Sequence, residues 1–363
     1  MQKGILLLII TTVLLSSCKP GQKPPADTQK PAVSLNKGVI LVDYREESKV
    51  DVFIDGDIFT SYIYPSELEK PVLYPVRTAE GTAVTRGYPL EPRAGERIDH
   101  PHQVGAWFSF GDVNGFDFWT NSRDMPEDSE AGLGRIIHRG VKRAESREAL
   151  GVLEVAADWQ VPGKDGSWHT LLQEKTIYEF SGDEHTRTID RITQLTAQED
   201  EVVFTDNNEG LFAIRVAREL EHPSDEPQVL TDAKGNAEEV KKVDNKGVQG
   251  HFLNSEGIEG TEAWGKKARW VSLSSKIAEE DISITLFDHP DNAGYPSYWH
   301  ARGYGLLSVN NLGAKVFDDN AEPILIKLTP GEPIVFKHRM HITSGSHATA
   351  AQLEKIFEDF SQK

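Results

Sequence analysis

Two segments of the chain are rich in histidine, aspartate and aromatic residues, whose side chains could form one reactive site together. Residues 99–115 hold two histidines, two aspartates and a tryptophan. Residues 288–290 and 298–305, near the other end of the chain, repeat the same combination of imidazole, carboxylate and aromatic groups and add an arginine. Imidazole and carboxylate are the groups that most often transfer protons in enzymes. We therefore expect one pocket assembled from distant parts of the chain.

His100 and His102 are the first candidates, because they stand two residues apart. On an extended segment, residues at this spacing point to the same face, and Pro101 between them indicates an edge or loop position. The two imidazoles could form an acid–base pair or provide two metal ligands. The alternative is that they only order the loop through hydrogen bonds.

Glu209 is the candidate general base. It ends a polar run and precedes the apolar residues 210–214. Partial loss of solvent at such a position raises the pKa of a carboxyl toward neutrality. The alternative is an exposed carboxylate at the start of a strand, and Asp206 is a weaker candidate of the same kind.

His300 and Arg302 would share one face of an extended segment. The arginine could hold a carboxylate or a pair of sugar oxygens through its planar fork, and His300 could donate a proton to a developing oxyanion. The alternative is a buried polar network that supports a turn. We expect His289 to order a loop and His338 to be a buried core histidine, while the role of His341 stays open.

Aromatic and charged residues near these positions complete the predicted substrate-binding set. Aromatic rings could stack on sugar faces, although in β proteins they more often belong to the core. The predicted substrate-binding residues are Trp107, Asp112, Trp119, Arg215, Tyr298 and Trp299.

No cofactor is predicted, although a metal ion bound by histidine and glutamate is an alternative. His100, His102, Glu209 and His300 supply the right number of ligands for such a site. A metal site built on cysteines is ruled out, because the chain has one cysteine. No glycine loop stands in the context that dinucleotide binding requires.

The N-terminal residues read as an export signal. Residues 1–18 contain Lys3, an apolar run over residues 5–15 and the sequence Ser-Ser-Cys, which is typical of a secretory signal and too short for a membrane span. Residues 15–18 resemble the lipobox of bacterial lipoproteins, which implies lipidation of Cys18. Proline-rich residues 19–34 predict a flexible tether. By resemblance to enterobacterial lipoprotein sorting, Lys19 after the cysteine implies the outer membrane, facing the periplasm or the cell surface.

The formal charge of −18 argues against nucleic acid as a partner. Attachment to a membrane is expected only through the lipid anchor.

Hydrophobic periodicity predicts an all-β fold for residues 35–363, which we expect to be one domain. Residues 334–342 alternate with the period of a half-buried strand, and several shorter runs are bounded by turn residues. Residues 123–132 and 222–250 read as loops. Apolar residues at 353, 356, 357 and 360 predict a C-terminal helix over residues 349–361. The expected architecture is a large antiparallel β-sandwich with that helix outside.

Residues 99–105, 111–115, 208–217, 288–290 and 298–306 resemble segments of the PmoA-like family of exported bacterial proteins. Gln103 and Val104 depart from the family pattern, where a histidine and an arginine are expected. The family label suggests methane oxidation, which this chain contradicts because it has no apolar span beyond the signal. The resemblance implies a galactose-mutarotase-like supersandwich, whose members act on or bind sugars.

These observations lead to three hypotheses. The first is an exported lipoprotein that acts on a sugar or oligosaccharide by His/Glu acid–base chemistry. It would be a carbohydrate-active isomerase or lyase, catalysing epimerisation, elimination or dehydration. The second is a non-catalytic glycan-binding lipoprotein, and the third a cupin-like His/Glu metalloenzyme. The predicted catalytic residues are His100, His102, Glu209, His300 and Arg302.

Overall fold

The computed structural model describes residues 37–122 and 132–363. The predicted signal, the tether, Cys18 and residues 123–131 of the predicted loop lie outside the described residues. No helix in the described part of the chain is both long and apolar enough to cross a membrane.

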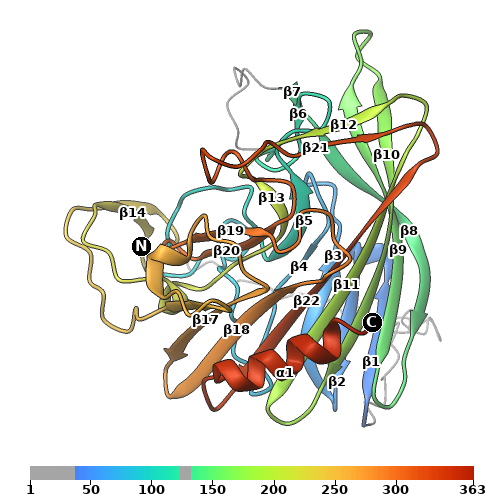
Figure 1. The fold of residues 1–363 in the computed structure, drawn as a ribbon. Helices are drawn as coiled ribbons and strands as arrows, with labels where there is room; N and C mark the ends of the chain where they lie inside the picture. Colours follow the sequence, from blue (N-terminus) through green and yellow to red (C-terminus); the bar gives the residue numbers. More distant parts are fainter. Residues whose placement is uncertain (1–36, 123–131) are drawn as a thin grey trace, which may run out of the picture. The chain divides into compact units, whose positions relative to one another are not determined.

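Two eight-stranded antiparallel sheets form the body of the protein (Figure 1). In spatial order, the first sheet contains β1 (Val39–Tyr44), β2 (Lys49–Ile54), β3 (Asp57–Ile63), β4 (Val72–Leu73), β5 (Ala106–Phe110), β13 (Gly210–Arg215), β20 (Leu306–Asn310) and β19 (Tyr298–Arg302). The second contains β16 (His251–Asn254), β17 (Trp270–Ile277), β18 (Glu280–Asp288), β22 (Pro333–Ser344), β11 (Thr186–Ala197), β10 (Trp168–Gly182), β9 (Gly151–Pro162) and β8 (Arg135–Glu145).

Short strand pairs and 3-10 helices lie outside the two main sheets. Three two-stranded pairs are β12 (Val202–Thr205) with β21 (Leu325–Leu328), β14 (Gln228–Thr231) with β15 (Ala237–Val240), and the parallel β6 (Phe116–Asp117) with β7 (Gly132–Leu133). The 3-10 helices are η1 (Arg45–Glu47), η2 (Arg218–Leu220) and η3 (Gly260–Ala263). Residues 222–250, predicted as a loop, therefore include the hairpin of β14 and β15.

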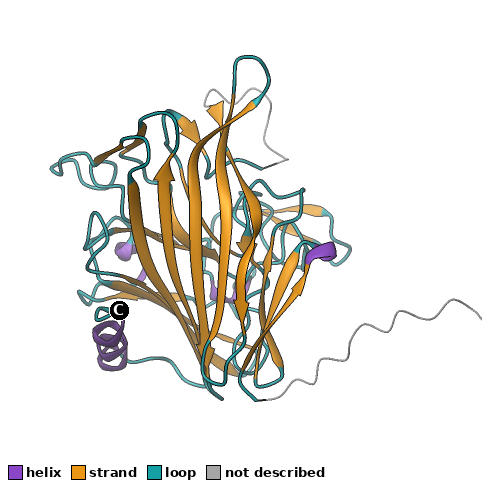
Figure 2. Ribbon diagram, turned by 90° about the vertical axis from the view of Figure 1, so that its right-hand side faces the viewer, coloured by secondary structure: helices purple, strands orange, loops and turns teal. Residues whose placement is uncertain are grey.

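Large apolar side chains fill the space between the two sheets. The ring of Phe108 on β5 lies 6.2 Å from that of Trp159 on β9 and 6.1 Å from that of Phe336 on β22. Figure 2 shows the long strands running side by side. The predicted all-β antiparallel sandwich is confirmed. Side chains alternate along each strand, so each sheet packs one face against the other sheet.

The C-terminal helix is also confirmed. Helix α1 (Ala350–Phe360) begins after Thr349, which forms a capping box with Gln352. Leu353 and Phe357 pack with Trp270 of β17 in one hydrophobic cluster. The helix thus covers the outer face of the second sheet, as Figure 1 shows.

Strand β22 follows the predicted alternation. His338 is fully buried, and its Nε2 lies 2.8 Å from the side-chain oxygen of Asn311. His341 points to the other face, with its Nδ1 2.9 Å from the Thr188 hydroxyl. His338 is therefore a core histidine, whereas His341 is half-buried on the other face of the sheet.

The outer face of the first sheet collects several of the predicted functional residues. In register, Trp107 of β5 pairs with Ala213 of β13, and His300 of β19 pairs with Ser308 of β20. Arg302 lies two residues beyond His300 on the same face, because strand side chains alternate. The candidate site is therefore expected on the outer face of the first sheet.

Candidate functional site

The segments near residues 100, 209 and 300 lie around β13, β20 and β19 of the first sheet. The Nδ1 atom of His300 lies 2.9 Å from the main-chain oxygen of Asn208, the residue before Glu209. The ring of His100 stacks on that of Tyr304, which lies 5.8 Å from the guanidinium carbon of Arg302. The convergence that the proposed site requires is therefore present in the fold.

Glu209 sits at the start of β13 with a largely buried carboxyl. Its Oε1 lies 3.4 Å from the side-chain nitrogen of Asn208, and the buried Trp119 indole stabilises the charged form of the carboxyl. Burial, aided by the charge of Asp117, raises the pKa of Glu209 to about 7, while Arg302 and the Trp119 indole oppose the increase. Both protonation states of this carboxyl are therefore populated near neutral pH.

His300 is held as a neutral ring. It is 4% exposed, and burial together with the charge of Arg302 lowers its pKa to about 4. A carbonyl oxygen only accepts hydrogen bonds, so Nδ1 carries the proton toward Asn208 and Nε2 keeps its lone pair. The structure thus gives His300 an acceptor at Nε2, in place of the proton-donor role expected from the sequence.

Arg302 is exposed beside two aromatic rings that the sequence analysis missed. Its guanidinium carbon lies 5.5 Å from the ring centre of Trp264 and 5.8 Å from that of Tyr304. Tyr304 in turn stacks on His100, with ring centres 4.9 Å apart and planes at 12°. Tyr304 belongs to the 298–306 motif and could have been found there, whereas Trp264 carries no recognisable motif.

The expected geometry of His100 and His102 is wrong. The Gln103 amide donates to the His100 carbonyl over 3.0 Å, and His100 has a φ of 43°. This closes a turn, so the segment is not extended and the two rings lie edge to face, 5.7 Å apart. His100 is exposed next to Tyr304, while His102 is buried in a separate cavity.

Arg215 has a structural role in place of the predicted substrate contact. It is fully buried, and its two terminal nitrogens donate to Gln103 Oε1 (2.5 Å) and Asp99 Oδ1 (2.6 Å). Arg86, also buried, donates to the same Asp99 oxygen over 2.6 Å and to the carbonyl of His100 over 3.0 Å. Two buried arginines therefore fix the turn that carries His100.

Asp99 is the anion that these two arginines share. Although burial opposes it, the contacts with His100, Arg215 and Arg86 hold the pKa of Asp99 well below its usual range. Neither Asp99 nor Arg86 was among the predicted site residues. Their partnership depends on strand register, which the sequence alone does not reveal.

Trp107 and Trp119 do not offer a stacking surface. Both are fully buried, with ring centres 5.1 Å apart, in a cluster that includes Val72 and Leu306. The expectation that they stack on a sugar face is wrong. The Trp119 indole instead contacts the Glu209 carboxyl and lowers its pKa.

Trp299 and Tyr298 are packed as well. Trp299 lies on the inner face of the first sheet, fully buried, with its Nε1 donating to the Ala268 carbonyl over 3.0 Å. Tyr298 is 7% exposed and stacks on Phe317 at 5.6 Å. Neither ring presents a free face to a ligand, because strand alternation and loop packing cover them.

Three further acidic or imidazole groups order loops. Asp112 accepts a hydrogen bond from the amide of Gly115 (2.9 Å), and His289 accepts one from the amide of Asp291 (3.1 Å), as expected for His289. Asp206 accepts from the main-chain nitrogens of Ala314, Lys315, Val316 and Ile324. Asp206, with both oxygens engaged, therefore stabilises a loop, and Asp112 closes a turn, while the binding role of Asp112 stays a prediction.

The ligand set for a metal centre is not assembled. Across residues 37–122 and 132–363, no three histidine, cysteine, aspartate or glutamate side chains are grouped so that they could hold a metal ion. His102 is turned into its own cavity, and His300 Nδ1 is engaged by Asn208.

The chain belongs to a family of unknown function, DUF6807, whose family model matches residues 49–358. No curated protein matches the chain. The PmoA-like resemblance finds no support in these comparisons and stays a prediction.

Similar solved structures include the galactosidase domain of alpha-galactosidase-sucrose kinase, AgaSK, at 9% identity and a TM-score of 0.38. That likeness covers 84% of this chain and 41% of the other, so this chain spans less than half of that protein. The galactose mutarotase related enzyme from Lactobacillus acidophilus has 9% identity and a TM-score of 0.29, covering 85% of this chain and 97% of that one. Likenesses at this level assign no activity to the chain.

Proposed function

We propose that this member of the DUF6807 family is a carbohydrate-active enzyme of isomerase or lyase type, in which Glu209 transfers the proton. One observation carries the proposal. The buried Glu209 carboxyl follows directly after Asn208, whose main-chain oxygen anchors the neutral ring of His300.

Epimerisation, β-elimination and dehydration all remove a proton next to a carbonyl or anomeric centre and return one elsewhere. A carboxyl with a pKa of about 7 can do both at neutral pH. His300 Nε2 can accept a hydrogen bond from a substrate hydroxyl. Arg302 supplies positive charge where an oxyanion would develop.

The surroundings of these groups support a sugar as substrate. Trp264 and Tyr304 are half-buried and flank the exposed Arg302. Partly exposed aromatic surface beside hydrogen-bonding groups suits a molecule with an apolar ring face and a rim of hydroxyls.

The test compares turnover with binding for wild type, Glu209→Gln and a control, Glu201→Gln, at an exposed carboxylate. Proton NMR in heavy water, with a panel of oligosaccharides, keto-sugars and unsaturated uronides, measures turnover, and calorimetry measures affinity. We expect Glu209→Gln to lower turnover by about 10²- to 10⁴-fold while affinity is kept. Binding without turnover by wild type would contradict the proposal and favour a glycan-binding protein.

We also propose that the protein is exported and anchored through a lipid on Cys18, at the outer membrane facing the periplasm or the cell surface. The apolar run over residues 5–15, the Ser-Ser-Cys sequence and the absence of any second cysteine in the chain support this location. The proline-rich residues 19–34 would let the catalytic domain stand away from the lipid surface.

A further inference from the structure

Arg302, at the end of β19, is an exposed cation without an anionic partner. Its guanidinium forms no hydrogen bond and no ion pair with any described residue, and its contacts are the rings of Trp264 and Tyr304 at 5.5 and 5.8 Å. Cation–π contacts hold the guanidinium by its charge and leave its N–H donors unused. The planar fork of donors is therefore open to an anion from outside the protein.

The same two rings place Arg302 beside the histidines of the site. Trp264 lies edge-on to His300, with ring centres 6.5 Å apart and planes at 83°. Tyr304 stacks on His100. An anion held by Arg302 would therefore lie close to His300, the ring that is anchored to the residue before Glu209.

A second positive charge lies next to Tyr304. Arg86 and Arg215 are both fully buried, and they share the one carboxylate of Asp99, each over 2.6 Å. Two guanidinium groups on one carboxylate leave one positive charge over. The guanidinium carbon of Arg215 lies 4.7 Å from the centre of the Tyr304 ring, so this charge lies on the ring that also contacts Arg302.

The neighbouring carboxylates do not cancel this charge, because other arginines already hold them. Glu96 pairs with Arg93 over 2.6 Å. Glu221 pairs with Arg97 over 2.8 Å and with Arg218 over 3.4 Å. The surplus of positive charge around Tyr304 therefore persists.

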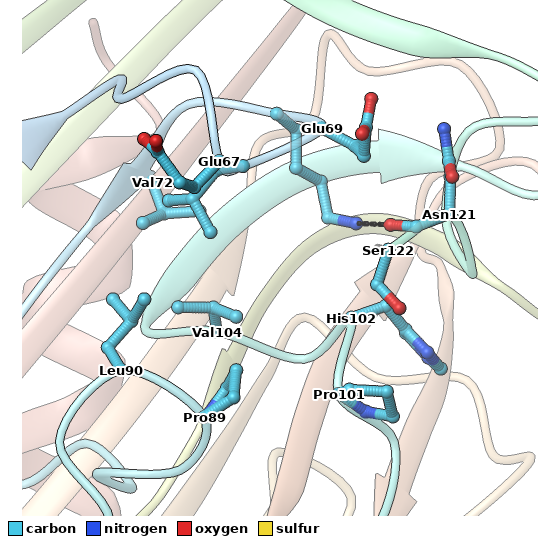
Figure 3. Close-up of a pocket in the computed structure, with 12 residues that line it drawn as sticks. Glu67, Glu69, Val72, Pro89, Leu90, Pro101, His102, Val104, Asn121 and Ser122 are labelled. Atoms are coloured by element: carbon cyan, nitrogen blue, oxygen red, sulfur yellow. Dashed lines mark hydrogen bonds between the residues drawn. The ribbon is translucent and has the colours of Figure 1, made fainter. Parts of the chain in front are cut away.

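The buried cation on the other side of the turn, Lys70, adds nothing to the surplus. Its Nζ donates to the carbonyls of Trp119 (2.8 Å) and Asn121 (3.4 Å), and Figure 3 shows it close to Asn121. Asp117 and Glu69 act on it as counter-charges. The positive charge available to a ligand is thus on the side of Arg302 and Tyr304.

A positive surface region in a chain of net charge −18 selects for an anionic ligand. A carboxylate matches the guanidinium fork, because two parallel N–H groups meet its two oxygens. A carboxylate on the sugar itself also provides the carbonyl beside which the proposed chemistry removes a proton.

We propose that the substrate is a uronic acid residue, a sugar that carries a ring carboxylate, and that Arg302 binds this carboxylate. The inference rests on the proposed function and deepens it, because it names the substrate class. Arg302 is then a specificity-determining residue that touches the substrate.

The carboxylate and Glu209 would act on the same carbon. In an elimination, the Glu209 carboxylate takes the proton from the carbon that bears the substrate carboxylate, and the C–H electron pair moves toward that carboxylate, where Arg302 stabilises the added charge. The pair then forms a double bond to the next ring carbon as the C–O bond there breaks, and the leaving oxygen takes the proton from Glu209. Return of a proton to the opposite face of the first carbon gives the epimer instead.

The experiment measures affinity by calorimetry for three uronate disaccharides and the methyl ester of each. The probes are digalacturonate, dimannuronate and diglucuronate, and esterification removes their charge while keeping rings and hydroxyls. The variants are Arg302→Gln and Arg302→Lys. Arg45→Gln, at a side chain 73% exposed on η1, is the matched control for the loss of one positive charge.

We expect at least one acid to bind about tenfold or more tightly than its own ester. Arg302→Gln should abolish this preference, Arg302→Lys should keep part of it because the charge remains without the fork, and Arg45→Gln should leave it unchanged. The proposal is overturned if no acid binds more tightly than its ester, or if the preference survives in Arg302→Gln.

The two proposals can fail separately, because this readout is binding and not turnover. A preference for acids that depends on Arg302, in a protein that turns over no sugar, would keep the ligand class and remove the enzyme assignment. Turnover of neutral sugars that Glu209→Gln abolishes, without any preference for acids, would remove the uronate and keep the role of Glu209.

Discussion

The Nδ1 atom of His300 lies 2.9 Å from the main-chain oxygen of Asn208. This one contact ties the 298–306 motif to the residue that precedes Glu209. It also fixes the tautomer of His300, since the carbonyl must accept the proton that Nδ1 carries. The neutral ring is thereby anchored to the residue before Glu209, at the start of β13.

The pH dependence of turnover should report Glu209 alone. If the carboxylate removes the proton, kcat/KM rises with pH through about 7 and then stays level, because the base is active when ionised. His300, with a pKa lowered to about 4, stays neutral over this range and adds no second transition. A pH profile between 5 and 9 that is flat in wild type would contradict this assignment.

Removing the charge of Asp99 should destabilise the protein. Asp99→Asn leaves Arg86 and Arg215 buried without their shared anion, which costs about 3 kcal/mol in the free energy of unfolding. Asp200→Asn, at the exposed contact with His169, is the control and should cost well under 1 kcal/mol. Urea titration measures both.

The sign of the pH effect on Asp99 follows from its lowered pKa. The stabilisation is fully present above the unfolded pKa of about 4 and is lost as pH falls below it toward the folded value. The difference in stability between wild type and Asp99→Asn should therefore shrink below pH 4. A difference that does not change with acidification would mean that the ion pairs contribute nothing.

Substituting two tryptophans should distinguish a residue that stabilises the fold from one that binds the sugar. Trp299→Ala removes a fully buried side chain from the core and should cost about 4 kcal/mol. Trp264→Ala, at a half-buried ring beside Arg302, should weaken sugar affinity with a much smaller change in stability. Thermal unfolding and calorimetry with the same sugar panel distinguish the two, and an unchanged affinity in Trp264→Ala would exclude that ring from the site.

Cys18 should carry the lipid. In a bacterial host that processes lipoproteins, the full chain should incorporate labelled palmitate and fractionate with membranes. Cys18→Ser should do neither, while its soluble domain keeps the wild-type melting temperature. Labelling of the serine variant would place the modification elsewhere.

The fold was predictable where the hydrophobic period was long. Residues 334–342 and 349–361 each show a clear repeat, so β22 and α1 appear close to their expected bounds. The site was predictable only in part. Glu209 precedes an apolar strand, which is enough to indicate desolvation.

The remaining site contacts depend on register and turn geometry. The left-handed backbone of His100 turns His102 away from it, and local sequence gives no sign of this. Arg215 meets Asp99 only because β13 aligns with the loop before β5. Trp299 and Ala301 share the core face of β19, and His300 between them points outward, because strand side chains alternate.

The central claim is that the Glu209 carboxyl exchanges its proton near neutral pH. Its most direct test is a carbon-13 NMR titration of glutamate-labelled protein, with the Glu209 signal assigned by its loss in Glu209→Gln. We predict a midpoint at about 7. A midpoint near the ordinary glutamate value of about 4.3 would show a solvated carboxylate and would contradict the account.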